Sequence, residues 1–209
     1  IQILPPDINH GMYGFSVDNG AIRYALSAIK SIGRPVIEGI VREREEHGEY
    51  TSLKTFVERN IDQINKRVVE NLIKAGALDC LEGNRKQKMT IYTQIIDSIN
   101  QDKKHTMAGQ LSLFDIASEE DKKEFEIRMP QVEEYPKEII LTFEKEVLGI
   151  YLSGHPLERY RNMMEKMISA KTSDFQPDDE TGIPEVYDNQ KVIVGGMITD
   201  KTIKYTKNN

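Results

Sequence analysis

The sequence is poor in residues that build covalent or metal-held frameworks. Its 209 residues contain one cysteine, Cys80, and no tryptophan. A single cysteine excludes an internal disulfide and a cysteine zinc cluster. The four histidines, His10, His47, His105 and His155, lack the spacing of metal ligands. We therefore expect no metal site in this chain.

Long apolar runs and targeting signals are also missing. No stretch approaches the roughly 18 apolar residues of a membrane helix. The start, IQILPPDIN, lacks the basic head and apolar segment of a secretory signal. The nucleotide-binding pattern GxxxxGKS/T does not occur either. These absences predict a cytoplasmic protein without a membrane partner.

Charge is unevenly divided along the chain, whose net charge is −6. Residues 21–104 carry 15 Lys and Arg against 12 Asp and Glu, a net of +3. Residues 105–209 carry 13 against 20, a net of −7. An acidic segment repels phosphates, so any nucleic-acid contact is expected in the first of these two parts.

Apolar residues at helical spacing predict two consecutive helix–hairpin–helix units. In the first, a helix beginning near Ile22 ends at the turn SIGR, and Pro35 favours the first turn of the next helix. In the second, Asn65 caps a helix that ends at Gly76. Two such units in tandem predict one compact helical domain.

The remaining segments predict a β-hairpin before this domain, and a linker, more helices and a β tail after it. Asn19-Gly20 favours a tight hairpin turn, whereas residues 101–134 show no sustained period. Pro136 begins a helix whose inward residues are Ile139, Ile140, Phe143, Val147 and Leu148, and a Met-rich helix covers 157–168. The expected fold is mainly α, and its segments are an extended lead-in and β-hairpin (1–21), the tandem helix–hairpin–helix domain (22–100), a linker (101–134), a helical connector (135–170), a loop (171–190) and strands (191–209).

The turns between the paired helices are candidate phosphate sites. A short hairpin leaves backbone N–H groups pointing outward beside a helix N-terminus, where the helix dipole favours an anion. Lys30 and Arg34 flank the first turn, and Lys66 and Arg67 follow the second. Basic residues at a helix N-terminus disfavour the helix itself, which favours a functional reason for them. The alternative is an ordinary helical hairpin with solvated lysines.

Other polar groups do not form a catalytic set. Ser153 and His155 lie in the turn LSGHP, where capping of the next helix is the simpler interpretation than a nucleophile with its base. Asp178, Asp179 and Glu180 lie in a proline-bounded loop, where adjacent acids are usually solvated. We therefore expect a binding module with no catalytic residues of its own.

The stretch QLSLF, residues 110–114, places apolar side chains in the charged linker. Leu and Phe side chains each contribute on the order of 1.5–3 kcal/mol when buried, less the free energy needed to order the segment. Such a peptide is suited to the pockets of a partner protein. The alternative is that it folds back on its own domain.

Five segments, in this order, resemble the alpha subunit of bacterial DNA polymerase III: LPPDIN, IRYALSAIKSIG, INKRVVENLIKAGALD, GQLSLF and FEKEVLGIYLSGHPLERY. The resemblance spans nearly the whole chain, and the tail KVIVGGMITDKTIKYTKNN resembles the opening strands of that family's OB fold. It implies that the chain is a fragment of a DNA-directed DNA polymerase that uses two metal ions. The Mg²⁺ ions would belong to a catalytic domain outside the fragment, which itself needs no cofactor.

The resemblance also implies the partners. The hairpins would hold double-stranded DNA by its backbone, QLSLF would bind the sliding clamp (the beta subunit), and other holoenzyme subunits would assemble around them. The implied DNA contacts are Lys30, Ser31, Ile32, Gly33 and Arg34 in the first hairpin and Ile64, Asn65, Lys66 and Arg67 in the second. The implied clamp contacts are Gln110, Leu111, Ser112, Leu113 and Phe114.

Two features depart from the family pattern, and two alternatives stay open. The second hairpin lacks the glycine of the first, and the OB segment holds about two strands, which cannot close a barrel. The chain could instead be a structural spacer with little DNA affinity. It could also be a separate enzyme domain such as a nuclease, which would need acids or histidines clustered on one face.

Overall fold

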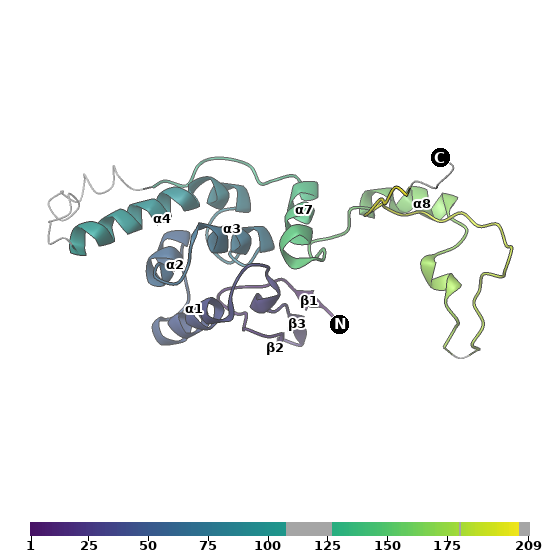
Figure 1. The fold of residues 1–209 in the computed structure, drawn as a ribbon, viewed down its shortest axis with the longest axis horizontal. Coiled ribbons are helices and arrows are strands. Elements are labelled where there is room, and N and C mark those ends of the chain that lie inside the picture. The colour runs from purple at the N-terminus through teal and green to yellow at the C-terminus, as the bar shows by residue number, and fades with distance from the viewer. Residues whose placement is uncertain (108–126, 180, 205–209) are drawn as a thin grey trace. The chain divides into compact units, whose positions relative to one another are not determined.

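The computed structural model describes residues 1–107, 127–179 and 181–204. The chain divides into two units, Ile1–Gly154 and His155–Asn209. As expected, the fold is mainly helical with a small sheet near the N-terminus (Figure 1). Among the described residues, no helix combines the length and apolar character required to cross a membrane.

A three-stranded sheet opens the first unit, with strand order β1-β3-β2. Strand β2 (Ser16–Asp18) pairs antiparallel with β3 (Ala21–Arg23), and β1 (Ile3–Leu4) pairs parallel with β3. Asn19 and Gly20, with φ of 49° and 81°, supply the left-handed backbone of a two-residue turn. The predicted hairpin is therefore confirmed, whereas β1 was not expected from the sequence.

The helix predicted from Ile22 is wrong, because only one 3-10 turn, η1 (Leu26–Ala28), forms there. An α-helix requires N–H groups that donate to carbonyls four residues earlier. Here they donate to distant carbonyls instead: Tyr24 to Leu4 at 2.9 Å, Leu26 to Met12 at 3.1 Å and Ser27 to Tyr13 at 3.1 Å.

Three helices follow: α1 (Arg34–His47), α2 (Leu53–Asn60) and α3 (Lys66–Ala75). The start of α1 and both ends of α3 are those that the sequence predicts. The Asn65 side chain accepts a hydrogen bond from the N–H of Val68 at 3.0 Å, which caps α3. Gly76 ends α3 in the left-handed conformation, with φ of 79°.

Helix α4 (Arg85–Met107) extends into the expected linker, and the far end of that linker is docked on it. Glu134 accepts hydrogen bonds from the N–H groups of Arg85 at 2.8 Å and Lys86 at 3.1 Å, at the N-terminus of α4. The Asn84 side chain donates to the carbonyl of Val132 at 2.9 Å. The end of the expected linker thus belongs to the folded part of the chain.

Helix α7 (Lys137–Leu148) buries Leu141, Glu144, Val147 and Leu148. Ile139 was predicted to face inward, but it is 39% exposed. The buried stripe instead includes an acid. Glu144 is 1% exposed, and its carboxylate accepts hydrogen bonds from the N–H groups of Leu152 at 2.8 Å and Ser153 at 2.9 Å.

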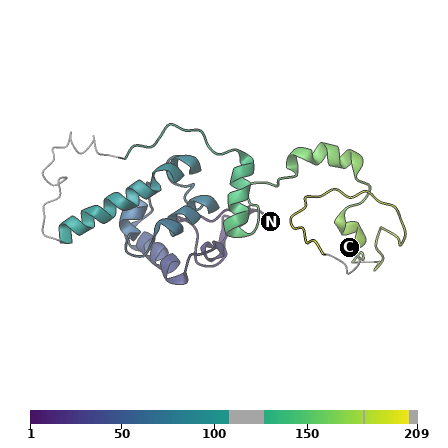
Figure 2. The same ribbon diagram turned by 45° about the horizontal axis from the view of Figure 1, so that its top comes forward.

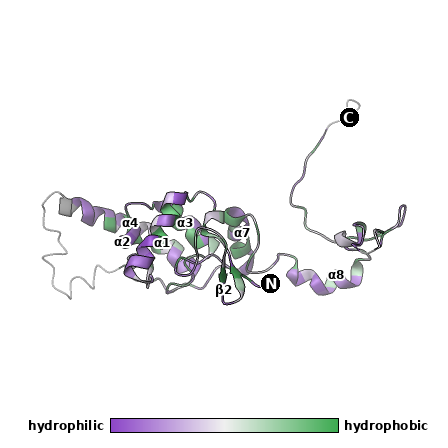
Figure 3. Cartoon of the chain, turned by 90° about the horizontal axis from the view of Figure 1, so that it is seen from below, coloured by the Kyte–Doolittle hydropathy of each residue, from purple (hydrophilic) through white to green (hydrophobic). Residues whose placement is uncertain are grey.

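Helix α3 lies at the centre of the first unit, packed against both α4 and α7 (Figures 1 and 2). Hydrophobic and hydrophilic residues share each of the helices α1 and α3, as amphipathic helices require (Figure 3). The core gathers apolar residues from all parts of the unit, among them Ile8, Leu26, Ile37, Phe56, Val69, Leu72, Leu78, Ile95 and Val147.

The second unit contains η2 (Glu158–Tyr160), α8 (Arg161–Met167) and η3 (Thr172–Phe175). Ala170 is the only buried residue among those described in this unit. The strand predicted at 191–200 is not formed, and no strand occurs within 191–204. Strands need paired neighbours, and two short strands alone leave most of their hydrogen-bonding groups without partners.

Candidate nucleic-acid interface

The first hairpin, residues 30–34, exposes its polar residues and buries Ile32, which is 9% exposed. Ser31 has φ of 64°, a left-handed conformation that is uncommon outside glycine and Asn. Gly33 is the N-cap of α1 and has an extended conformation, with φ of −75°. The positive φ of this turn therefore falls on Ser31 and not on the glycine.

The backbone of this hairpin has donors that are not used within the fold. In the described part of the chain, no hydrogen bond is donated by the N–H groups of Ile32, Gly33 and Arg34. A Cβ atom added at Gly33 would meet only the Cδ of Pro35, at 3.7 Å, which is an ordinary contact. The fold itself has no steric need for glycine there, and the missing side chain leaves the N-terminus of α1 open to close approach.

The second hairpin, residues 61–67, has a different backbone. Ile64 is buried, Asn65 is the N-cap of α3, and Lys66 and Arg67 are exposed in its first turn. None of its residues has a positive φ. The second hairpin therefore needs no glycine for its backbone conformation.

Within the first unit, each hairpin is held by the helix that follows the other hairpin. The Asn71 side chain of α3 donates to the carbonyl of Lys30 at 2.8 Å, one helical turn from Arg67. Conversely, α1 passes the second hairpin at Gly39, where an added Cβ would lie 1.7 Å from the side-chain oxygen of Gln63. This reciprocal packing joins the two protein hairpins, which are predicted to contact DNA, in one folded domain.

The basic side chains at the hairpins are exposed, and two of them have ion-pair partners. The Nε of Arg34 lies 2.7 Å from Glu38, and this hydrogen bond raises the pKa of Arg34. The Nζ of Lys66 lies 2.7 Å from Asp97. Exposed pairs of this kind contribute little to stability, so a phosphate can replace the carboxylate at small cost.

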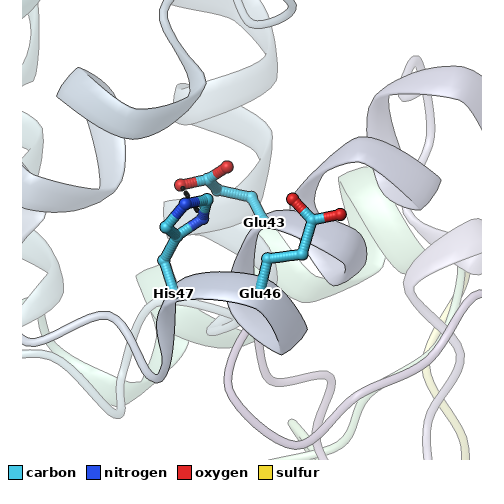
Figure 4. A group of neighbouring side chains, drawn as sticks. All are labelled: Glu43, Glu46 and His47. Carbon is cyan, nitrogen blue, oxygen red and sulfur yellow. Dashed lines mark ion pairs between the residues drawn. The ribbon is translucent and has the colours of Figure 1, made fainter.

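A group of three potential metal ligands lies at the end of α1: Glu43, Glu46 and His47 (Figure 4). Glu43 already accepts a hydrogen bond from Arg59 at 3.0 Å, which lowers its pKa, and pairs with His47 at 3.1 Å. Because Arg59 comes from α2, the geometry is that of an ion-pair network between two helices. A cation there would have to displace Arg59.

The other candidate residues from the sequence either make structural hydrogen bonds or lie outside the described residues. Ser153 donates a short hydrogen bond to Glu144, and the Nδ1 of His155 accepts one from the N–H of Leu157 at 3.2 Å. Asp178 accepts a hydrogen bond from the N–H of Thr181 at 2.8 Å within its loop. The predicted clamp peptide, residues 110–114, lies outside the described residues.

Sequence reasoning missed Asn71. It is 8% exposed and is the one polar residue among the buried residues of α3, which the structure describes in full. A polar residue within an otherwise apolar helical stripe is the signal that was available, because buried amides require hydrogen-bond partners. The identity of that partner, the Lys30 carbonyl, is set by the tertiary fold alone.

Known proteins provide an independent comparison. Residues 1–88 match the family model described as a helix-hairpin-helix motif. DNA polymerase III subunit alpha of Vibrio cholerae is 34% identical over 99% of this chain. Over nearly its whole length, the chain is similar to part of DNA polymerase III subunit alpha. The same subunit of Escherichia coli K12 is 34% identical over 99% of the chain, and that of Chlamydia pneumoniae is 35% identical over 84%.

The alpha-subunit resemblance expected from the five sequence segments is therefore confirmed. The chain spans 14–17% of the length of these alpha subunits. The helix-hairpin-helix match covers both hairpins described above, residues 30–34 and 61–67.

Proposed function

We propose that this chain grips the backbone of double-stranded DNA, without reading its sequence, as part of a replicative polymerase alpha subunit. The reciprocal packing of the two hairpins carries the proposal, because it sets two helix N-termini with exposed basic residues on one body. Backbone donors and cations at such termini bind phosphates of any sequence.

The second part of the proposal is a tether to the sliding clamp through QLSLF. The sequence supports it, since apolar side chains lie between charged flanks. The described residues add that α4, before the segment, and residues 127–135, after it, both lie in the first unit. A clamp bound by this peptide would stay beside the DNA grip, which raises its effective concentration there.

The whole protein is proposed to be a DNA-directed DNA polymerase that works with the other holoenzyme subunits in the cytoplasm. Its Mg²⁺ ions and catalytic residues would belong to parts of the subunit outside these 209 residues. A purely structural spacer is the competing proposal, and it requires negligible DNA affinity.

Salt dependence of duplex binding tests the grip. The proposed contacts are removed in one variant by four alanine substitutions at Lys30, Arg34, Lys66 and Arg67. Each phosphate contact adds about 0.9 to the slope of log K against log salt, so the slope should fall by up to about 3.6. Fluorescence anisotropy with a random-sequence duplex at several salt concentrations measures it.

The matched control carries alanine at four exposed lysines of the second unit, Lys166, Lys171, Lys191 and Lys201. It changes net charge equally, so it should keep the wild-type slope. Equal slopes for the wild type and the hairpin variant would reject the grip and favour the spacer.

Titration with purified sliding clamp tests the tether. A Leu111→Ala, Phe114→Ala double variant should lose binding, because each truncation removes apolar surface from the proposed clamp pocket. The control is an Ile116→Ala, Phe125→Ala double variant, which removes apolar groups outside the pentad. Equal loss in both variants, or in neither, would contradict the assignment of QLSLF.

A further inference from the structure

We propose that Asn71 is a positioning residue for the first hairpin of the protein, residues 30–34. Its side chain sets the direction of the backbone N–H donors that follow Lys30. This inference rests on the proposed grip and deepens it. Asn71 itself touches no phosphate in this account, and it acts through the backbone of Lys30.

The backbone of Lys30 is held from both sides. Its carbonyl accepts the Asn71 Nδ2–H at 2.8 Å, and its N–H donates to the carbonyl of Val147 at 2.9 Å. Val147 lies in the last turn of α7, where carbonyls have no partner within their own helix. Helix α3 and the end of α7 thus fix the two peptide units on either side of the Lys30 Cα.

The residue after this fixed point is Ser31, whose φ is 64°. A left-handed conformation is unfavourable for a residue with a side chain, and it persists where the surroundings determine it. The two hydrogen bonds at Lys30 supply that determination. Relaxation of Ser31 would rotate the next peptide units, which carry the free N–H groups of Ile32, Gly33 and Arg34.

Burial makes the Asn71 contact specific. The side chain is 8% exposed and shares the buried stripe of α3 with Val68 and Leu72. Water has little access to replace the Lys30 carbonyl as acceptor. A purely structural role remains the rival explanation, in which Asn71 satisfies one carbonyl and stabilises the fold without affecting the DNA site.

Two variants of the 209-residue chain separate the explanations. Asn71→Leu removes the donor with little change in volume, and Asn71→Asp sets a carboxylate against the Lys30 carbonyl. The control is Asn84→Ala, which removes the cap of α4 and its bond to Val132 but touches neither hairpin. All three should lower the melting temperature, because each loses a hydrogen bond.

The first measurement is the ¹⁵N–¹H amide spectrum without DNA. The amides of Ile32, Gly33 and Arg34 should shift in both Asn71 variants and stay in place in Asn84→Ala. The second is duplex affinity over several salt concentrations, well below each melting temperature. The Asn71 variants should bind about five-fold more weakly, with a salt slope smaller by about one, and Asn84→Ala should match the wild type.

Unshifted hairpin amides, or wild-type affinity and slope in both Asn71 variants, would overturn the positioning role. If the wild-type chain itself fails to bind duplex, the proposed grip fails, and the amide spectrum still decides whether Asn71 orients the hairpin. The two failures are therefore distinguishable.

Discussion

At the scale of single residues, the first unit contains buried charges, each with partners. Lys88 is fully buried, and its Nζ donates to the carbonyls of Leu81 and Gly83, while burial lowers its pKa. The Nη1 of Arg85 lies 3.5 Å from Glu144, which also accepts the backbone bonds described above. Removal of one partner of such a group lowers the free energy of unfolding strongly, because the other partner is left buried and unsatisfied.

Replacement of Glu144 by Gln should therefore lower the free energy of unfolding by about 3 kcal/mol. The substitution removes the charge opposite Arg85. If the amide oxygen keeps the two backbone bonds, which share one carboxylate oxygen, the NH₂ group is set against the Arg85 guanidinium. Urea denaturation followed by circular dichroism measures the change. The control is Glu146→Gln on the same helix, where Glu146 is 55% exposed beside Lys74. It should change stability by less than about 0.5 kcal/mol, and equal losses in the two variants would contradict the special role of Glu144.

At the scale of elements, local chemistry was predictable and long-range contacts were not. The cap at Asn65, the end at Gly76 and the turn at Asn19-Gly20 each depend on neighbouring residues, and each was predicted. The helix expected from Ile22 fails because its N–H groups find carbonyls far away in the sequence.

Other structural features were not predicted from the sequence, for related reasons. Residues 127–135 dock on α4 through Glu134, which accepts a hydrogen bond from the backbone N–H of Arg85. The spacing of apolar residues in the sequence does not predict this bond. The positive φ of Ser31 in the first hairpin was likewise not predicted from the sequence. The hydrogen bond from Asn71 to the Lys30 carbonyl also forms only when α3 packs beside the first hairpin, so the sequence alone did not predict it.

At the scale of the whole molecule, the two units differ in how they bury apolar surface. The first has an extensive core, whereas the second leaves large apolar side chains exposed, including Ile193 at 60% and Ile198 at 86%. Both lie in the stretch 191–204, where no strand forms. Exposed β-branched apolar side chains on an extended backbone that forms no strand are a template for association between chains.

The chain should therefore self-associate through this stretch at high concentration. An Ile193→Lys, Ile198→Lys variant should remain monomeric at concentrations where the wild type forms larger species, because lysines oppose edge pairing. Sedimentation velocity over a range of concentrations measures this. The control, Ile139→Lys, places a lysine at an exposed apolar site in the first unit and should behave as the wild type. Identical concentration dependence in all three chains would contradict the prediction.

The end of α4 limits the geometry of any assembly that the proposed clamp peptide makes. Helix α4 ends at Met107, and the pentad begins at Gln110, three residues later. A fully extended chain spans at most about 3.6 Å per residue, so this leash is no longer than about 11 Å. A clamp bound by this peptide would therefore lie close to the end of α4, and the length of α4 would set its distance from the DNA grip.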